Sequence, residues 1–224
     1  MNTRSSWPGV AALLGVTLVW AFSFGIIGRY LPGVDSFWVA LIRLLLATLC
    51  FLPFLRLKGR DAVDRLILFG LGAVQFGVMY VSYLAAFRFL EAWQVALFSI
   101  LTPIWVALVD SACARRWAGR IFLAAFLSVA GAAVIRFGEV PSGNFWFGFL
   151  LMQVANLAFG FGQVAFREWK FRHPEVRETD VFGLLYAGAL FVALVGAFFA
   201  GSLTELPDLD ATEWIALLYL GLVA

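Results

Sequence analysis

Charged residues are scarce in this sequence of 224 residues. Only 13% are Asp, Glu, Lys or Arg, whereas 63% are hydrophobic, and this charged share is about half that of an ordinary soluble domain. A soluble domain is excluded, because successive apolar runs reach the roughly 20 residues that cross about 30 Å of hydrocarbon. Ten-residue stretches of alternating polarity are absent too, which excludes barrel strands. The sequence therefore predicts an all-α integral membrane protein, whose helices satisfy their own backbone groups.

Histidine and cysteine are also rare. His173 is the only histidine and lies in a charged loop, so neither a histidine metal site nor a Ser-His pair is expected. Cys50 and Cys113 lie near the ends of predicted helices and are interpreted as packing residues, not as a disulfide or metal site. We predict no metal and no cofactor. We also predict no enzymatic activity, since Asp110 is alone where an aspartyl pair would need two carboxylates.

The apolar runs predict about seven complete membrane helices and part of an eighth. The expected ranges are 10–28, 36–55, 66–87, 94–114, 121–135, 145–166 and 181–200, followed by a short apolar segment at 214–224. The first run is interpreted as a retained helix, because no small-residue cleavage site follows it. The last segment would give about 16 Å of helix, roughly half a bilayer. We therefore expect a truncated chain whose natural form continues beyond Ala224.

Basic residues gather on one side of the predicted bundle. Twelve of the sixteen lie in the N-terminal tail or in the loops after the second, fourth and sixth helices. They are Arg4, Arg56, Lys58, Arg60, Arg65, Arg115, Arg116, Arg120, Arg167, Lys170, Arg172 and Arg177. The opposite loops are mostly acidic, so the positive-inside rule predicts a cytoplasmic N-terminus. The small net charge of +2 comes from these loops and indicates orientation, not nucleic-acid binding.

A short sequence occurs twice, as AFSFG at residues 21–25 and as AFGFG at residues 158–162. The copies lie in the first and the sixth predicted helix, which cross the membrane in opposite directions. This arrangement is typical of the inverted-topology repeats of secondary transporters. The sequence therefore predicts two inverted five-helix repeats, at residues 1–138 and 145–224, of which the second is incomplete.

Three stretches resemble the EamA-type transporters of the drug/metabolite transporter (DMT) superfamily. The matching stretches are residues 20–24 with Pro32, Trp38 and Arg43, residues 80–91 with 95–104, and residues 128–131. The resemblance implies ten helices in two inverted halves around a central cavity that carries small metabolites such as amino acids. One departure concerns the Gly-Glu pair that usually follows the fourth helix in this family. Arg115 and Arg116 stand there, so the role of that carboxylate is not carried over.

Four residues form a polar stripe on the sixth predicted helix. Gln153, Asn156, Gly160 and Gln163 follow one another at spacings of three, four and three, which places them on one helical face. Amides that faced lipid would leave polar groups unsatisfied, so the stripe should face protein or water. It either lines a substrate cavity or forms interhelical hydrogen bonds, which contribute about 0.6 kcal/mol each on average.

Other candidate binding residues lie on the first three predicted helices. Gln75 shares a face of the third helix with Met79 and Tyr83, and substrate contact and helix packing explain it equally well. Trp20 lies near the middle of the first helix, where an indole N–H needs a partner or water. Packing and cavity lining are both open for Trp20, and the family resemblance favours lining.

Arg43 lies about 10 Å below the outer end of the second predicted helix. A central arginine costs at least about 2.5 kcal/mol in a bilayer. Three interpretations remain open: a functional or interhelical role, a side chain that snorkels to the interface, and an error in the helix boundary. In a functional role, Arg43 would bind a substrate carboxylate.

Pro103 lies near the middle of the fourth predicted helix and cannot donate to the carbonyl of Ser99. We expect Ser99 and Thr102 to compensate locally, and we favour a fixed kink over a hinge. Asp110 is interpreted as part of an interfacial ion pair with Arg115, not as a proton relay.

The leading hypothesis is a secondary transporter that exports small organic metabolites such as amino acids by alternating access. Its site is expected between the first, third and sixth helices, in a protein of the bacterial inner membrane. The alternative is a non-transporting or inactive truncated membrane protein or subunit. Besides lipid and the substrate, a second copy of the chain is a candidate partner. A small-residue ladder, formed by Ala124, Ser128 and Ala132, favours close helix packing and offers a homodimer face.

Overall fold

The computed structural model describes residues 7–114, 119, 123, 126–127 and 144–224, and its described elements are helical. Six helices are long and apolar enough to cross a membrane, which confirms the predicted helical membrane bundle. The expected helix at 121–135 falls largely outside the described residues, as do Arg115, Arg116 and the ladder of Ala124, Ser128 and Ala132. The two-repeat division stays a prediction.

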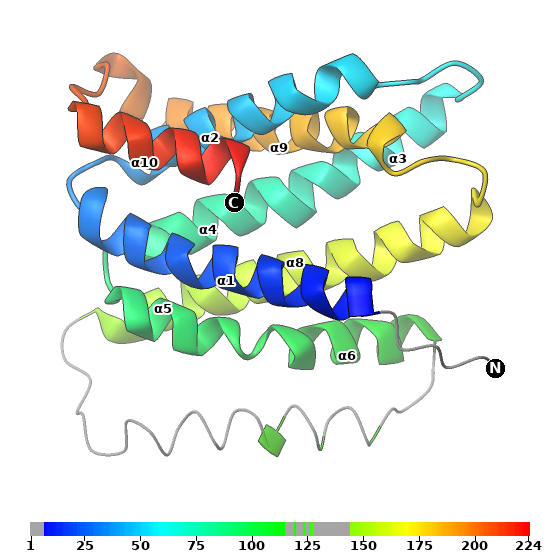
Figure 1. Cartoon of the computed structure of the whole chain (residues 1–224), viewed down its shortest axis with the longest axis horizontal. Coiled ribbons are helices and arrows are strands. Elements are labelled where there is room, and N and C mark those ends of the chain that lie inside the picture. Colours follow the sequence, from blue (N-terminus) through cyan, green and yellow to red (C-terminus); the bar gives the residue numbers. More distant parts are fainter. Residues whose placement is uncertain (1–6, 115–118, 120–122, 124–125, 128–143) are drawn as a thin grey trace.

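The described elements follow the predicted order (Figure 1). They are α1 (Trp7–Tyr30), α2 (Ser36–Phe51), η1 (Leu52–Phe54), α3 (Ala62–Gly72), η2 (Ala73–Val78), α4 (Met79–Ala86), α5 (Ala92–Ser99), α6 (Thr102–Ala114), α8 (Phe145–Arg172), α9 (Thr179–Ala200), η3 (Ser202–Thr204) and α10 (Ala211–Leu222). The third predicted helix is continuous through α3, η2 and α4, and η2 is a π-helical turn. The fourth is divided into α5 and α6.

Acidic side chains determine where several helices begin. The carboxylate of Asp35 accepts from the backbone N–H of Phe37 at 2.9 Å and starts α2. Asp61 accepts from the N–H of Asp64 at 2.7 Å and starts α3. Glu91 and Asp210 start α5 and α10 with reciprocal capping boxes. These carboxylates satisfy N–H groups that a helix start leaves unpaired.

The two ends of the bundle differ in charge, as the sequence predicts. Figure 1 shows the start of α1, the α2–α3 loop and the α8–α9 loop at one end, and the α1–α2, α4–α5 and α9–α10 loops at the other. The first of these ends, called the basic end below, carries Arg56, Lys58, Arg60, Lys170 and Arg172. Every described odd-numbered crossing therefore starts from the basic end.

Helix α9 packs between α2 and the α3–η2 segment, at distances that only glycine permits. A Cβ atom on Gly72 would collide with the backbone of Leu185, and one on Gly188 would collide with the carbonyl oxygen of Phe69. Backbone-to-backbone contact of this kind is how small residues promote helix association in membranes. Next to it, the fully buried Leu44 of α2 and Ala193 of α9 belong to the largest apolar cluster.

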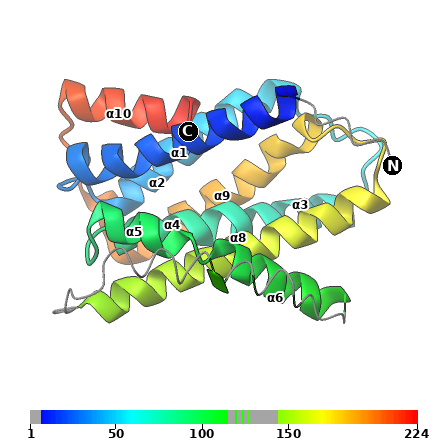
Figure 2. The same cartoon turned by 60° about the horizontal axis from the view of Figure 1, so that its bottom comes forward.

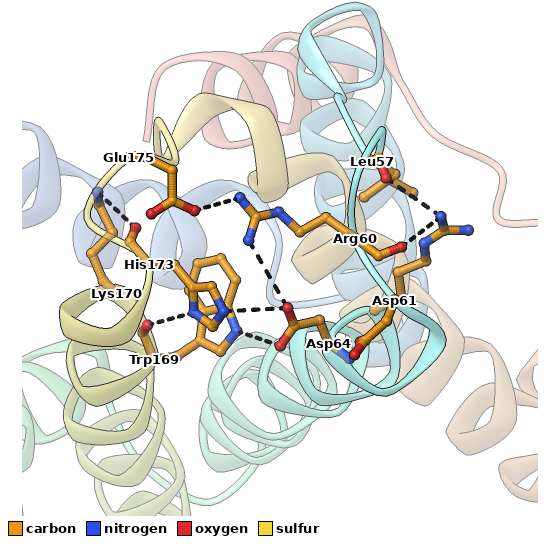
Figure 3. A network of polar contacts seen from close by, with 9 residues as sticks. Leu57, Arg60, Asp61, Asp64, Trp169, Lys170, His173 and Glu175 are labelled. Carbon is orange, nitrogen blue, oxygen red and sulfur yellow. Dashed lines mark hydrogen bonds and ion pairs between the residues drawn. The ribbon is translucent and has the colours of Figure 1, made fainter.

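Polar side chains join the α2–α3 and α8–α9 loops at the basic end (Figure 3). Asp64 lies at the centre: it accepts from Trp169 Nε1 at 3.3 Å, lies 3.3 Å from His173 Nε2, and pairs with Arg60 at 3.9 Å. The ring of His173 stacks on Trp169 with 4.5 Å between the centroids. Arg60 also binds Glu175 at 3.0 Å. The pKa of the Glu175 carboxyl group is lowered, first by a hydrogen bond to its own backbone and second by the hydrogen bond from Arg60.

The close crossing of α9 predicts a strong effect of a single methyl group. Gly188→Ala should destabilise the protein by about 1–3 kcal/mol, because the helices must move apart. The measurement is the midpoint of thermal unfolding in detergent. Gly70→Ala is the matched control, since the space around Gly70 within α3 is open. Equal midpoints for the two variants would contradict the close crossing.

The network at the basic end predicts unequal effects of its two carboxylates. Asp64→Ala should lower the unfolding midpoint, at a cost of about 1 kcal/mol, because Trp169 and His173 lose their shared acceptor. Glu175→Ala should leave the midpoint nearly unchanged, since the Glu175 side chain is 64% exposed and exposed ion pairs contribute little. A larger loss for Glu175→Ala would show that the central position of Asp64 has no energetic weight.

Candidate functional site

A cavity lies among α1, α2, α4, the α5–α6 junction and α8, with about 590 Å³ of space not filled by atoms, including its open side. Helix α8 passes between α4 and α6 (Figure 2), so these helices bring their side chains together. Aromatic side chains form much of the wall: Trp20, Phe24, Tyr80, Tyr83 and Phe159. The predicted helices one, three and six all contribute, and helices two and four also take part.

Arg43 supplies the positive charge of the cavity. Its side chain is only 5% exposed, so it does not snorkel, and it lies inside α2, which excludes a boundary error. Nη2 donates to the hydroxyl of Tyr80 at 3.1 Å, and the guanidinium carbon lies 4.6 Å from the centre of that ring. Nε and Nη1 are buried without a hydrogen-bond partner among the described residues.

The free donors of Arg43 indicate an anionic ligand. A guanidinium has only N–H donors and no acceptor, and Nε and Nη1 together carry three of the five. Leaving charged donors buried and unpaired is costly. A ligand with a carboxylate would satisfy them with charge-assisted hydrogen bonds.

The chain between α5 and α6 is broken on the wall of the cavity. Pro103 has no N–H, so the carbonyl of Ser99 lacks its helical donor, and Thr102 Oγ1 lies 2.6 Å from that oxygen. The expected local compensation by Thr102 is confirmed, and the helix is interrupted here as expected, whereas the preference for a fixed kink over a hinge stays a prediction. At the break, the backbone N–H groups of Ile100 and Leu101 donate to the carbonyls three residues earlier, those of Leu97 and Phe98, each at 3.2 Å.

Asn156 connects α8 to this break. Its Nδ2 donates to the carbonyl oxygen of Phe98 at 2.9 Å, and its Oδ1 lies 2.9 Å from Thr102 Oγ1. The side chain is 4% exposed and lines the cavity. Both interpretations of Asn156, interhelical hydrogen bonding and cavity lining, therefore apply at once.

The remaining members of the polar stripe do not line the cavity. Gln153 faces α6, where its Oε1 accepts from Trp105 Nε1 at 2.9 Å. Gly160 packs against the same helix, since a Cβ atom there would lie 3.0 Å from the backbone nitrogen of Val106. Gln163 is exposed. Only Asn156 of the four therefore lines this cavity, because different neighbours cover different parts of one long helix face, and a role of the other three in substrate binding stays a prediction.

Gln75 does not line the cavity either, although it is 3% exposed. Its side chain fills the space above Gly162, and its Oε1 has no hydrogen-bond partner among the described residues. Gln75 lies in the π-helical turn of η2, nearer the basic end than Met79 and Tyr83, which do line the cavity. The difference is therefore one of depth along the helix.

The two copies of the repeated sequence lie on the same cavity. Ser23 and Phe24 belong to the first copy and Phe159 to the second, and all three line it. Trp20, next to the first copy, packs edge to face on Phe159 with 6.0 Å between the centroids. Trp20 is 47% exposed, so it forms part of the rim.

The structure also places Asp110 and the two cysteines, whereas Arg115, the expected partner of Asp110, lies outside the described residues. Asp110 does form an ion pair, and its described partner is Arg167 of α8. Cys50 and Cys113 are exposed free thiols. In the described part of the chain, no group of His, Cys, Asp and Glu side chains could hold a metal ion.

Sequence reasoning missed Tyr80 as a site residue, and it assigned Thr102 only to the proline kink. Tyr80 is three residues from Tyr83, and this helical spacing could have suggested a shared wall. The contact between Thr102 and Asn156 joins residues 54 positions apart. No local pattern indicates such a pair.

Comparison with known proteins gives a family and close relatives. The model of the EamA-like transporter family matches residues 7–137. A protein named probable biotin transporter from Pseudomonas aeruginosa is 42% identical over 216 residues, which cover 95% of this chain and 74% of that protein. The biotin transporters of Salmonella typhimurium and Escherichia coli are 37% and 36% identical over 217 residues, which cover 96% of this chain and 72% of theirs.

The different surroundings of two glutamines predict different effects of removing them. Gln153→Leu should lower the midpoint of thermal unfolding, at a cost of about 1 kcal/mol, because Trp105 Nε1 loses its acceptor. Gln163→Leu should leave the midpoint unchanged, since its side chain is exposed. A loss in Gln163→Leu as large as that in Gln153→Leu would contradict this placement.

Proposed function

Because the chain belongs to the EamA-like transporter family, we propose that it is a secondary transporter of biotin in the bacterial inner membrane. The family supports a membrane transporter, and relatives named biotin transporters, at 36–42% identity, suggest the substrate. The comparisons give no support to amino acids as substrates. None of the described residues that line the cavity is acidic, so an amino acid's ammonium group would lack a counter-charge.

The unpaired guanidinium of Arg43 is the observation that carries this proposal. Biotin has a carboxylate at the end of an apolar chain and a fused ring system with a cyclic urea at the other. The carboxylate would satisfy Nε and Nη1 of Arg43, and Tyr80 would hold the guanidinium in place. The aromatic wall suits the chain and the sulfur-containing ring, since ligand sites are mostly apolar with a few placed polar groups.

Alternating access requires a layer that opens and closes beside the cavity. The contact of Gln75 with Gly162 lies next to the cavity towards the basic end. We propose that this layer separates when the site opens to that side, and that this side is the cytoplasm, as the positive-inside rule predicts. Export, as expected from the sequence, and a homodimer both stay predictions.

Transport of radiolabelled biotin into liposomes that contain the purified protein tests the proposal. Unlabelled biotin should compete, and amino acids should not. Loading biotin inside or outside the liposomes under an imposed gradient separates export from import. A folded protein that moves no biotin in either direction would contradict the proposal and favour a non-transporting membrane protein.

Arg43→Gln should weaken biotin transport about tenfold to a hundredfold, because a hydrogen bond to a charged group contributes about 1.5–3 kcal/mol. The preference for biotin over its uncharged amide should disappear in the same variant. Arg88→Gln is the matched control, since Arg88 is exposed and does not line the cavity. An unchanged preference for the acid in Arg43→Gln would show that the carboxylate binds elsewhere.

A further inference from the structure

The break between α5 and α6 holds the amide of Asn156 in one orientation. The carbonyl oxygen of Phe98 can only accept a hydrogen bond, so the group 2.9 Å from it must be the Nδ2 amino group. The Oδ1 atom is therefore turned towards Thr102. Asn156 thus presents its Oδ1 acceptor towards Thr102, next to the cavity that it lines.

Thr102 cannot satisfy both acceptors that lie around it. Its Oγ1 is 2.6 Å from the carbonyl oxygen of Ser99 and 2.9 Å from Oδ1 of Asn156. A hydroxyl group has one hydrogen to donate. Whenever it points to Ser99, whose helical donor is missing at Pro103, Oδ1 of Asn156 has no donor among the described residues, at a position that is only 4% exposed.

We propose that Oδ1 of Asn156 binds an N–H group of the cyclic urea of biotin, and that this contact selects biotin among carboxylates. The assignment rests on the proposed function, in which Arg43 binds the carboxylate. Arg43 offers only donors, whereas Asn156 offers an acceptor, so the cavity is complementary to a molecule with a carboxylate and an N–H group. When the urea donates to Oδ1, the hydroxyl of Thr102 turns to Ser99.

Lipoate is the informative competitor. It has a carboxylate on an apolar chain and a sulfur-containing ring, but its ring has no N–H group. With lipoate bound, Thr102 must either donate to Asn156 and leave Ser99 unsatisfied or do the reverse. Wild-type protein should therefore bind biotin at least about fivefold more tightly than lipoate, the value of one hydrogen bond of about 1 kcal/mol.

Two variants should separate the roles of Asn156 and Thr102 in this ratio. Asn156→Ala removes the acceptor, so biotin should lose at least about fivefold in apparent affinity while lipoate changes little. Thr102→Val removes the hydroxyl group whichever acid is bound, so Oδ1 can accept only from a ligand N–H, and the ratio of lipoate to biotin inhibition constants should stay at or above the wild-type value. Gln163→Ala, an exposed amide on the same helix, is the control and should change neither acid.

The experiment measures inhibition of biotin uptake into liposomes by unlabelled biotin, desthiobiotin and lipoate. Desthiobiotin keeps the urea and the carboxylate, so it should follow biotin in every variant. An equal loss for all three acids in Asn156→Ala would overturn the inference. So would a ratio of lipoate to biotin inhibition constants that Asn156→Ala leaves unchanged or that Thr102→Val lowers to about one. The proposed function would still stand if wild-type protein transports biotin and Arg43→Gln weakens it. If Asn156→Ala does not fold, Thr102→Val decides, because a ratio that falls to about one in that variant would overturn the inference.

Discussion

The missing N–H of Pro103 is the constraint on which the rest of the site depends. Inside a bilayer no water satisfies the backbone groups that a broken helix exposes, so the protein must supply partners itself. The hydroxyl of Thr102 donates to the carbonyl of Ser99, and Nδ2 of Asn156 on α8 donates to the carbonyl of Phe98. The break therefore fixes the position of α8 next to α6 and the orientation of the Asn156 amide. One proline thus determines both a packing contact and the polarity of one wall of the cavity.

The opposite wall depends on close helix packing. Arg43 lies on α2, and α2 packs along α9, which in turn crosses α3 at Gly72 and Gly188. Because these backbones touch, α9 has little freedom to move sideways, and α2 is held at a fixed distance from α4. Tyr80 can then reach the guanidinium of Arg43. The strength of the Arg43 site consequently depends on glycine residues that are not in contact with it.

Much of this architecture can be predicted from the sequence, because the bilayer restricts the lengths and kinds of element that can cross it. Apolar length predicts the spans, the distribution of Lys and Arg predicts which loops share an end, and the Pro103 rule predicts the role of Thr102. The periodicity of α8 is less informative, since it places Asn156 and Gln163 on one face but says nothing about which helices cover that face. The helical pattern around Gln75 likewise says nothing about how deep the cavity lies, and Gln75 is outside it. The pair of Thr102 and Asn156 depends on tertiary packing alone.

The placement of the polar groups connects recognition to movement. Arg43 belongs to the first part of the chain, residues 1–138, whereas Asn156 belongs to the second part, residues 145–224, and Trp20 and Phe159 meet between them. A ligand shifts a conformational equilibrium only by the difference between its affinities for the two states. A molecule held by Arg43 alone has the same contacts whether or not α8 moves away. Its affinity is therefore the same in both states, and it does not shift the equilibrium between them. On the proposed function, biotin would bind both parts at once, so the N–H contact that gives selectivity is also the contact that would favour closure around the substrate.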